Sequence, residues 1–138
     1  MIKKITQEQA WQIRHDVMWP DKPFDYIKVD GDDRAIHYGL FIETKLVSVI
    51  SLFIDNGEAQ FRKFATITKE QRKGYGCALL QHTLRQAKLA GVQRIWCNAR
   101  TNKTAFYQKF GLHETNHCFS KSGKEYVIME KLLSTETM

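Results

Sequence analysis

One short stretch of this sequence has the residue types and spacing of a phosphate-binding turn. Residues 71–78 read Gln-Arg-Lys-Gly-Tyr-Gly-Cys-Ala and lie between a predicted strand and a predicted helix. The first turn of a helix has N–H groups without partners at the positive end of the helix dipole, so it attracts phosphate. Gly74 and Gly76 lack the Cβ atoms that would keep phosphate oxygens from the backbone, and Arg72 and Lys73 add positive charge. The alternative is an ordinary glycine-containing turn with a solvated basic flank, because neither a Walker loop nor a full G-x-G-x-x-G is present.

A second stretch matches a metal-binding pattern, and its context argues against metal. Residues 113–117 read His-Glu-Thr-Asn-His, the H-E-x-x-H pattern of zinc peptidases. That chemistry needs both imidazoles on one helical face. Here the run follows Gly111 and contains Thr115 and Asn116, which are poor helix formers. In a strand the two rings would lie about 13 Å apart, at about 3.3 Å per residue, so we expect no metal site.

Hydrophobic periodicity predicts the elements that must position these stretches. The apolar spacing predicts a helix at 6–18, a second helix from Gly74 to Gly91, and a short helix at 101–110. The segment 19–33 is irregular and predicts a loop or a short helix. Alternating or buried apolar runs predict six strands, at 35–42, 45–54, 59–68, 92–99, 112–120 and 125–133. With a strand at the N-terminus, the order is β-α-βββ-α-β-α-ββ, typical of a mixed α/β (α+β) sheet flanked by helices.

Two motifs in this order resemble those of the GNAT family of N-acetyltransferases. Residues 71–76 fit the family's Q/R-x-x-G-x-G/A signature. Asn102 and residues 105–112, Ala-Phe-Tyr-Gln-Lys-Phe-Gly-Leu, are similar to its later N…A-x-x-Y-x-x-x-G-[FL] segment. Phe64-Ala65-Thr66 stands where the preceding strand of that family lies. A weaker likeness to the ElaA-like branch runs through residues 14–17 and through the spaced residues Phe119, Gly123, Tyr126 and Met129.

The resemblance implies the acyl-CoA N-acyltransferase fold and acetyl transfer from acetyl-CoA to a primary amine. In that fold the sheet is mostly antiparallel and is splayed after the fourth strand, where the pantetheine arm pairs with backbone. The cofactor-binding residues implied are Phe64, Ala65, Thr66, Gln71, Arg72, Lys73, Gly74, Tyr75, Gly76, Cys77 and Asn102. The pyrophosphate would rest on the N–H groups from about Arg72 to Cys77, in agreement with the dipole argument.

The resemblance also implies a general acid, whereas the general base is not evident. Tyr107 would protonate the departing thiolate, and a backbone N–H near Thr66 would stabilise the oxyanion. Many relatives have a Glu on the fourth strand, but residues 60–63 read Gln-Phe-Arg-Lys. A basic pair cannot accept the ammonium proton at neutral pH. His37 is the substitute that we single out, since its pKa is ordinarily near ~6.5, ahead of Glu58 and Glu125.

The acceptor is predicted less sharply than the donor. Trp19 and Arg62 are candidate substrate-binding residues, and Arg62 could hold the carboxylate of an amino-acid-like acceptor. A small-molecule amine is the expected partner. Two alternatives stay open: a CoA-binding regulatory module without catalysis, and acetylation of a macromolecular amine such as aminoacyl-tRNA. No compact Lys/Arg run is present, so a nucleic-acid partner is not expected.

Length and composition fit this interpretation. The 138 residues suit one domain spanning 1–138, and the net charge of +6 suits an anionic partner. No apolar run approaches the roughly 18 residues of a membrane span, and no signal-peptide core begins the chain. Three cysteines without a C-x-x-C pair predict a reducing, cytoplasmic location. A homodimer through the terminal strands would be compatible with the family.

Overall fold

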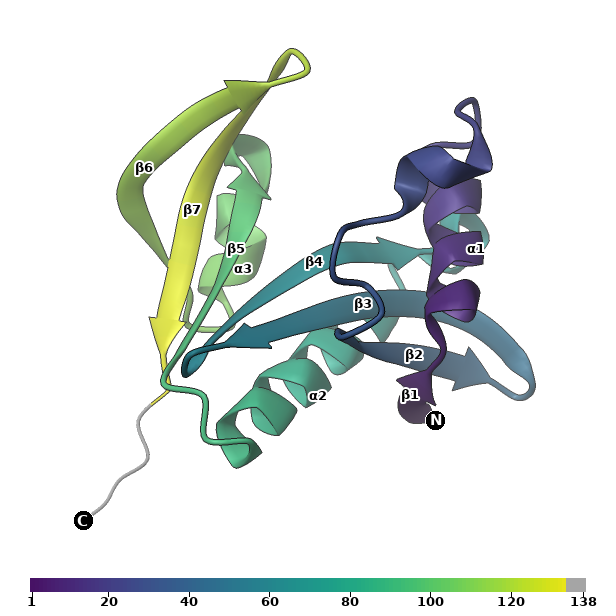
Figure 1. Cartoon of the computed structure of the whole chain (residues 1–138), viewed down its shortest axis with the longest axis horizontal. Helices are drawn as coiled ribbons and strands as arrows, with labels where there is room; N and C mark the ends of the chain where they lie inside the picture. Colours follow the sequence, from purple (N-terminus) through teal and green to yellow (C-terminus); the bar gives the residue numbers. More distant parts are fainter. Residues whose placement is uncertain (134–138) are drawn as a thin grey trace. The chain divides into compact units, whose positions relative to one another are not determined.

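The computed structural model describes residues 1–133, which form seven strands, three α-helices and three 3-10 turns (Figure 1). The strands are β1 (Ile2–Ile5), β2 (Ile36–Ile42), β3 (Lys45–Asp55), β4 (Glu58–Thr66), β5 (Arg94–Arg100), β6 (His113–Lys121) and β7 (Lys124–Leu132). The helices are α1 (Gln7–Met18), α2 (Tyr75–Leu89) and α3 (Thr104–Gln108), with 3-10 turns η1 (Phe24–Ile27), η2 (Thr68–Glu70) and η3 (Thr101–Lys103). The predicted order of elements is therefore confirmed, and η1 is the short helix allowed for in the segment 19–33.

The chain divides into two compact units. The first unit contains Met1–Phe53 and Phe61–Arg85, and the second contains Ile54–Gln60 together with the described residues from Gln86 onward. In the first unit β1 pairs antiparallel with β2, and β2 pairs antiparallel with β3. The prediction of a single domain over 1–138 stays a prediction.

In the second unit, the start of β4 pairs in parallel with β5, and β5, β7 and β6 pair antiparallel in that order. The strand order of the sheet is β1-β2-β3-β4-β5-β7-β6. The parallel ladder covers only Glu58–Gln60 with Arg94–Trp96, although β4 continues to Thr66. The predicted fold class, a mixed and mostly antiparallel sheet with helices, is confirmed.

Helix α1 begins where its sequence specifies. Thr6 accepts a hydrogen bond from the backbone N–H of Gln9, and the Gln9 side chain accepts one from the Thr6 N–H, which completes a capping box. On the inner face, Ile13 packs against Val49 and Ala65. The next residues on this face, Val17 and Met18, extend the same cluster, so the C-terminal end of α1 lies beside the end of β4.

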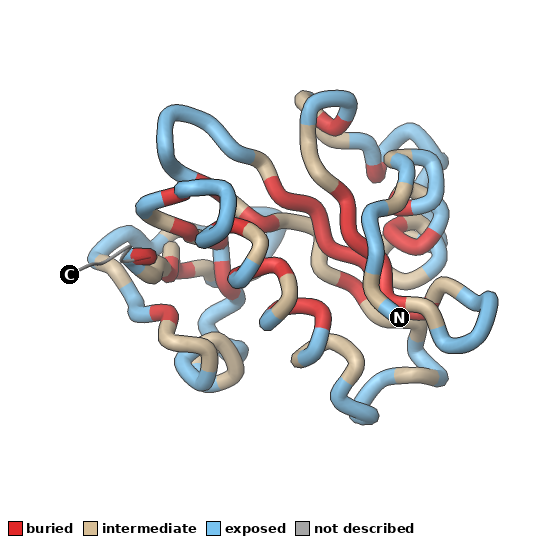
Figure 2. Tube along the Cα trace, turned by 90° about the horizontal axis from the view of Figure 1, so that it is seen from below, coloured by how far each residue is buried: buried red, intermediate tan, exposed pale blue. Residues whose placement is uncertain are grey.

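Helix α2 buries one apolar stripe, and β3 is buried on both of its faces. Leu80, Leu84 and Ala87 are buried at helical spacing, as predicted. Six consecutive residues of β3, from Val47 to Leu52, are buried, and Figure 2 shows such buried stretches along the strands and exposed residues in the connections. Two of the six, Ser48 and Ser51, are polar and hydrogen-bonded. No helix of the described residues is both long and apolar enough to cross a membrane.

Candidate active site

The turn from β4 into α2 presents backbone donors to solvent. Gly74 has a φ of +86°, and its carbonyl accepts the first helical hydrogen bond from the Ala78 N–H at 3.1 Å. The N–H groups of the first turn that follows, Tyr75–Cys77, therefore have no acceptor within the helix. The first turn of α2 contains no acidic residue that would occupy these N–H groups or repel a phosphate. This is the arrangement that binds a phosphate at a helix N-terminus.

The two glycines of the turn have different roles. A Cβ added to Gly74 would meet no protein atom within 4 Å, so the approach to the turn is open. A Cβ on Gly76 would lie 3.2 Å from Cζ of Phe64 and 3.7 Å from Oγ1 of Thr66. Gly76 therefore lets the first turn of α2 lie close against the last residues of β4.

A side-chain hydrogen bond fixes the turn to the strand. Gln71 Nε2 donates to the carbonyl oxygen of Thr66 at 2.9 Å, and the Gln71 N–H donates to the Thr68 carbonyl. Lys73 forms an ion pair with Glu70 at 2.9 Å, and this hydrogen bond lowers the pKa of Glu70 and raises that of Lys73. The charge of Lys73 is thus partly compensated, while Arg72 is exposed with a φ of +67°.

A serine of β3 also holds the end of β4. Ser48 Oγ lies 3.2 Å from the carbonyl oxygen of Ala65 and 2.9 Å from Thr66 Oγ1. Earlier in the same strand, Lys63 has a φ of +56°, an interruption of the pleat that is common beside active sites. The structure therefore brings the predicted residues of β4 and of the turn, 64–66 and 71–77, together in one unit.

Tyr107 and Asn102 belong to the second unit, in the segment that follows β5. Asn102 is exposed in η3, and Tyr107 lies in α3 with its ring edge-on to Phe106 at 5.2 Å. The Tyr107 carbonyl accepts from the N–H groups of Phe110 and Leu112, which fixes the backbone. Burial raises the pKa of the Tyr107 phenol well above its ordinary value, and Cys97 adds to the shift. The phenol is therefore protonated at neutral pH and can act as a proton donor.

The structure does not support His37 as the general base. His37 is only 4% exposed, with Nε2 at 2.9 Å from the Asp32 carbonyl and Nδ1 at 2.7 Å from Ser51 Oγ. A carbonyl can only accept, so Nε2 carries the proton and Nδ1 accepts from the Ser51 hydroxyl. Both ring nitrogens are engaged within the fold, which counts against His37 as the group that receives the acceptor's proton, and that role stays a prediction.

The remaining candidate residues have local partners. Trp19 is half-buried, with its ring edge-on to Tyr26 at 5.2 Å. The Arg62 guanidinium lies 5.9 Å from the centre of the Phe53 ring. Glu58 pairs with Arg94 at 3.1 Å, and Glu125 accepts from the Ser120 hydroxyl at 2.7 Å. Because both carboxylates already have a partner, neither is singled out as the general base.

The H-E-x-x-H run lies in a strand, as predicted. His113 and His117 belong to β6, in which the pairing register shifts between Glu114 and Cys118. The helical spacing that a zinc peptidase needs is absent from this run. Among the described residues, no group of three or more His, Cys, Asp or Glu side chains could hold a metal ion.

The sequence interpretation missed one polar cluster, which joins Arg14 to Asp32 and Ser51. Arg14 has no exposed surface and Asp32 is 4% exposed. A signal was present, because Arg14 stands between Ile13 and Val17 on the apolar face of α1. A charged residue on such a face needs a buried partner, but the sequence alone does not say which one.

Comparison with protein families identifies the class of protein to which this fold and site belong. The chain matches the acetyltransferase (GNAT) domain family over residues 2–133. It therefore belongs to the GNAT family, and it is an N-acetyltransferase. The predicted family membership is confirmed on nearly the whole described chain.

Individual relatives agree with this classification. The chain is 28% identical to the uncharacterized N-acetyltransferase YitI of Bacillus subtilis (strain 168), over 97% of each chain. A putative N-acetyltransferase from Lactobacillus plantarum has the same fold, with a TM-score of 0.84, 20% identity, and coverage of 96% of this chain and 98% of that one. Escherichia coli ElaA superposes with a TM-score of 0.80 at 18% identity, over 95% and 98%. This likeness shows the fold and leaves the ElaA-like branch a hint.

Some structures with this fold contain coenzyme A. One is the PaiA N-acetyltransferase of Thermoplasma acidophilum, solved in complex with coenzyme A. It is 17% identical to this chain, with a TM-score of 0.72, over 96% of this chain and 98% of that one. At this identity the comparison shows the common fold alone.

Proposed function

We propose that this protein transfers the acetyl group of acetyl-CoA to the primary amine of a small molecule in the cytoplasm. One observation carries the proposal: an open helix N-terminus without acidic residues stands directly beside the end of β4. That pair of features suits a ligand with a diphosphate at one end and an extended amide-containing arm at the other. Membership of the GNAT family supports the reaction type.

The diphosphate and the pantetheine arm of acetyl-CoA each have a counterpart among the predicted residues. The diphosphate binds the N–H groups between Arg72 and Cys77, with the exposed Arg72 adding charge. The pantetheine arm binds backbone of Phe64, Ala65 and Thr66, where side-chain identity matters little. Gln71 contributes by fixing the Thr66 carbonyl rather than by touching the ligand, because its amide is already engaged there. Asn102 is proposed as a further contact on resemblance alone.

The transfer itself needs a neutral amine and a proton for the sulfur. The amine lone pair attacks the thioester carbonyl, a backbone N–H of β4 stabilises the oxyanion, and the C–S bond then breaks. Tyr107 gives its phenolic proton to the departing thiolate. The attacking nitrogen, which is positively charged in the tetrahedral intermediate, then loses a proton, and Tyr107 is reprotonated. Since burial raises the pKa of Tyr107, the proton must move together with C–S cleavage rather than before it.

No dedicated base is required in this scheme. His37 is engaged on both nitrogens, so we propose that the acceptor loses its proton to solvent before it binds. Trp19 and Arg62 are proposed contacts on the acceptor side. The reaction rate then rises with pH as the neutral fraction of the amine increases.

The proposal is tested by thiol release from acetyl-CoA with spermidine, tyramine and free amino acids as acceptors. Turnover with at least one of these is expected, and turnover with a protein or aminoacyl-tRNA amine alone would replace the small-molecule acceptor. If the protein binds coenzyme A in calorimetry but acetylates none of these amines, it is a binding module and not an enzyme. Failure to bind coenzyme A would overturn the proposal altogether.

The role of Tyr107 makes a separate prediction. Tyr107→Phe is expected to lower kcat by about 10²–10⁴-fold, the usual contribution of a general acid, with little effect on coenzyme A affinity. In the wild-type enzyme the rate should rise with pH and show no decline below about pH 10, since the raised pKa keeps the phenol protonated. A kcat of Tyr107→Phe within about threefold of wild type would remove the residue from the mechanism.

A further inference from the structure

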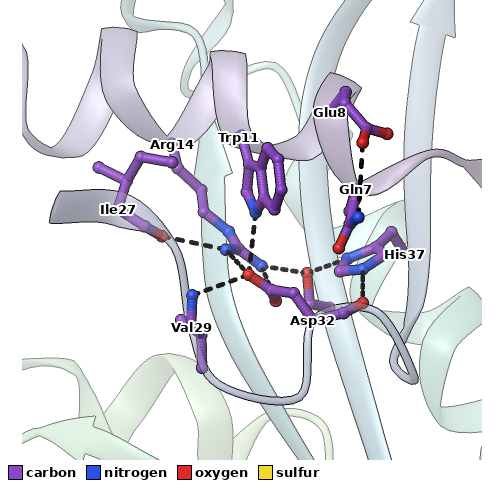
Figure 3. A network of polar contacts seen from close by, with 9 residues as sticks. Gln7, Glu8, Trp11, Arg14, Ile27, Val29, Asp32 and His37 are labelled. Atoms are coloured by element: carbon purple, nitrogen blue, oxygen red, sulfur yellow. Dashed lines mark hydrogen bonds and ion pairs between the residues drawn. The ribbon is translucent and has the colours of Figure 1, made fainter. Parts of the chain in front are cut away.

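A closed polar network lies between α1 and strands β2 and β3 in the first unit (Figure 3). Arg14 donates to both carboxylate oxygens of Asp32, at 2.7 and 2.9 Å. Its second terminal nitrogen also donates to Ser51 Oγ at 2.9 Å, and Ser51 donates to His37. His37 returns to the Asp32 carbonyl, which closes the ring of contacts.

All four members are withdrawn from solvent. Arg14 and Ser51 are fully buried, and Asp32 and His37 are each 4% exposed. Burial alone would raise the pKa of Asp32, but the hydrogen bonds from Arg14 and Trp11 outweigh it and hold the pKa at about 2. Arg14 and Asp32 are therefore both charged near neutral pH, and their bidentate hydrogen bonding fixes the geometry of the pair.

The network holds one particular segment, residues 19–34. Arg14 donates to the Ile27 carbonyl at 3.1 Å, and the Val29 N–H donates to the Asp32 carboxylate at 2.8 Å. Trp11 Nε1 donates to the same carboxylate at 2.9 Å. The chain just before these anchoring residues is open, with Phe24 39% and Tyr26 51% exposed. A largely exposed segment is thus attached to the core at two buried residues, Ile27 and Asp32, and the ion pair with Arg14 holds Asp32.

The start of this segment adjoins the strand proposed for the donor. Val17 and Met18 pack in the cluster that contains Ala65, and Trp19 follows them directly. None of the hydrogen bonds of this network involves residues 64–77, whose backbone is proposed to bind acetyl-CoA and is called the donor cradle below. The segment therefore begins beside the strand proposed for the donor, where an amine must approach the thioester.

We propose that Arg14 and Asp32, linked through Ser51 and His37, are positioning residues that hold residues 19–34 in the conformation that binds the amine acceptor. This inference rests on the proposed acetyl transfer and assigns the positioning of the acceptor to a buried network. A displacement of about 1 Å in a substrate-positioning element can cost about 10²-fold in rate. Loss of the network should therefore raise the acceptor KM strongly and leave the affinity for coenzyme A unchanged.

The test compares two neighbouring aspartates. Asp32→Asn removes the buried carboxylate charge, and Asp33→Asn removes the same charge from a side chain that is 70% exposed. Three quantities are measured in each variant: KM for the amine of the panel that wild type uses best, Kd for coenzyme A by calorimetry, and hydrogen exchange over residues 19–34. Asp32→Glu, which keeps the charge, serves as the conservative variant.

Asp32→Asn is expected to raise the acceptor KM at least about tenfold, with Kd for coenzyme A within about twofold of wild type. The largest increase in exchange rate is expected over residues 19–34, which open locally, and a smaller one in the core. Asp32→Glu should recover part of the KM effect, and Asp33→Asn should change none of the three. If Asp32→Asn does not fold, Ser51→Ala provides the same test, with a smaller rise in KM expected because one link alone is removed.

Three results would overturn the inference. They are a wild-type KM in Asp32→Asn or in Ser51→Ala, a Kd for coenzyme A that rises in parallel with KM, and equal effects in Asp32→Asn and Asp33→Asn. Failure of the proposed function looks different, since wild type itself would acetylate no amine. Exchange over residues 19–34 needs no turnover, and unchanged exchange in Asp32→Asn would by itself contradict the anchoring.

Discussion

The donor cradle and the Arg14–Asp32 network are built in opposite ways. The cradle consists of backbone groups at the end of β4 and the start of α2, and it is open to solvent at Gly74. The network consists of side chains from α1, β2, β3 and the segment before β2, and it is closed to solvent. The cradle therefore uses main-chain groups, which do not depend on the type of residue. The network uses side-chain groups, which only particular residue types provide.

This difference determines how each region responds to substitution. A backbone site tolerates changes of side chain unless a new Cβ blocks the ligand, so only its glycines are sensitive. A buried ion pair is sensitive to either partner, because removing one leaves the other charged without compensation. The predictions below compare the two regions, beginning with the largest expected effect.

The largest effect on stability is expected in the network. Asp32→Asn should lower the free energy of unfolding by about 3–5 kcal/mol, because the fully buried Arg14 guanidinium keeps its charge and loses its counter-ion. Urea unfolding measures the change. Asp33→Asn is the matched control and should leave the midpoint unchanged. Equal midpoints for wild type and Asp32→Asn would show that the network does not stabilise the fold.

Acid provides a check within the same experiment. The Asp32 pKa is lowered from 3.8 to about 2 in the folded state, so its contribution is present above about pH 4 and is lost as pH falls toward 2. Wild type should therefore lose about 2 kcal/mol more than Asp32→Asn between pH 5 and pH 2. Parallel acid profiles for the two proteins would contradict the low pKa.

The next largest effect is expected on coenzyme A binding at the open turn of the donor cradle. Gly74→Ala is expected to weaken coenzyme A binding about tenfold, because the new Cβ points into the space through which the diphosphate approaches. Gly57→Ala is the matched control, since Gly57 also has a positive φ, +79°, with no protein atom near its Cβ position. Both variants should lose similar stability from backbone strain. Equal coenzyme A affinities in calorimetry would place the diphosphate elsewhere.

The smallest effect separates two neighbouring cations of the cradle. Arg72→Ala should weaken coenzyme A binding about threefold at low salt and less at high salt, because an exposed charge is screened. Lys73→Ala should have a smaller effect, since Glu70 already pairs with Lys73 at 2.9 Å. Calorimetry at two salt concentrations measures both. A larger loss in Lys73→Ala would show that the ligand displaces Glu70.

The elements that depend on local patterns were predicted well. Thr6 and Gln9 specify the start of α1 through a capping box, and the apolar stripe of α2 is confirmed at Leu80, Leu84 and Ala87. The strand at residues 113–117 was also predicted, because Thr115 and Asn116 disfavour the helix that a zinc site would need. Each of these signals lies within a few residues of the element that it specifies.

The surroundings of His37 could not be predicted in the same way. Its position on a strand was predicted correctly, but its role depends on Ser51, 14 residues away, and on the Asp32 carbonyl. Hydrogen bonds between side chains that are distant in sequence leave no periodic pattern, so an imidazole that is fully engaged cannot be distinguished from one that is free.

The sequence by itself determined the GNAT family, the order of helices and strands, and the glycine turn at the start of α2, because spacing, capping and glycine content act over short distances along the chain. Only the tertiary structure decided that Arg14 is buried, that Asp32 rather than Asp33 is its partner, and that His37 has both nitrogens engaged. These features depend on which elements pack together, and burial makes their electrostatic interactions strong.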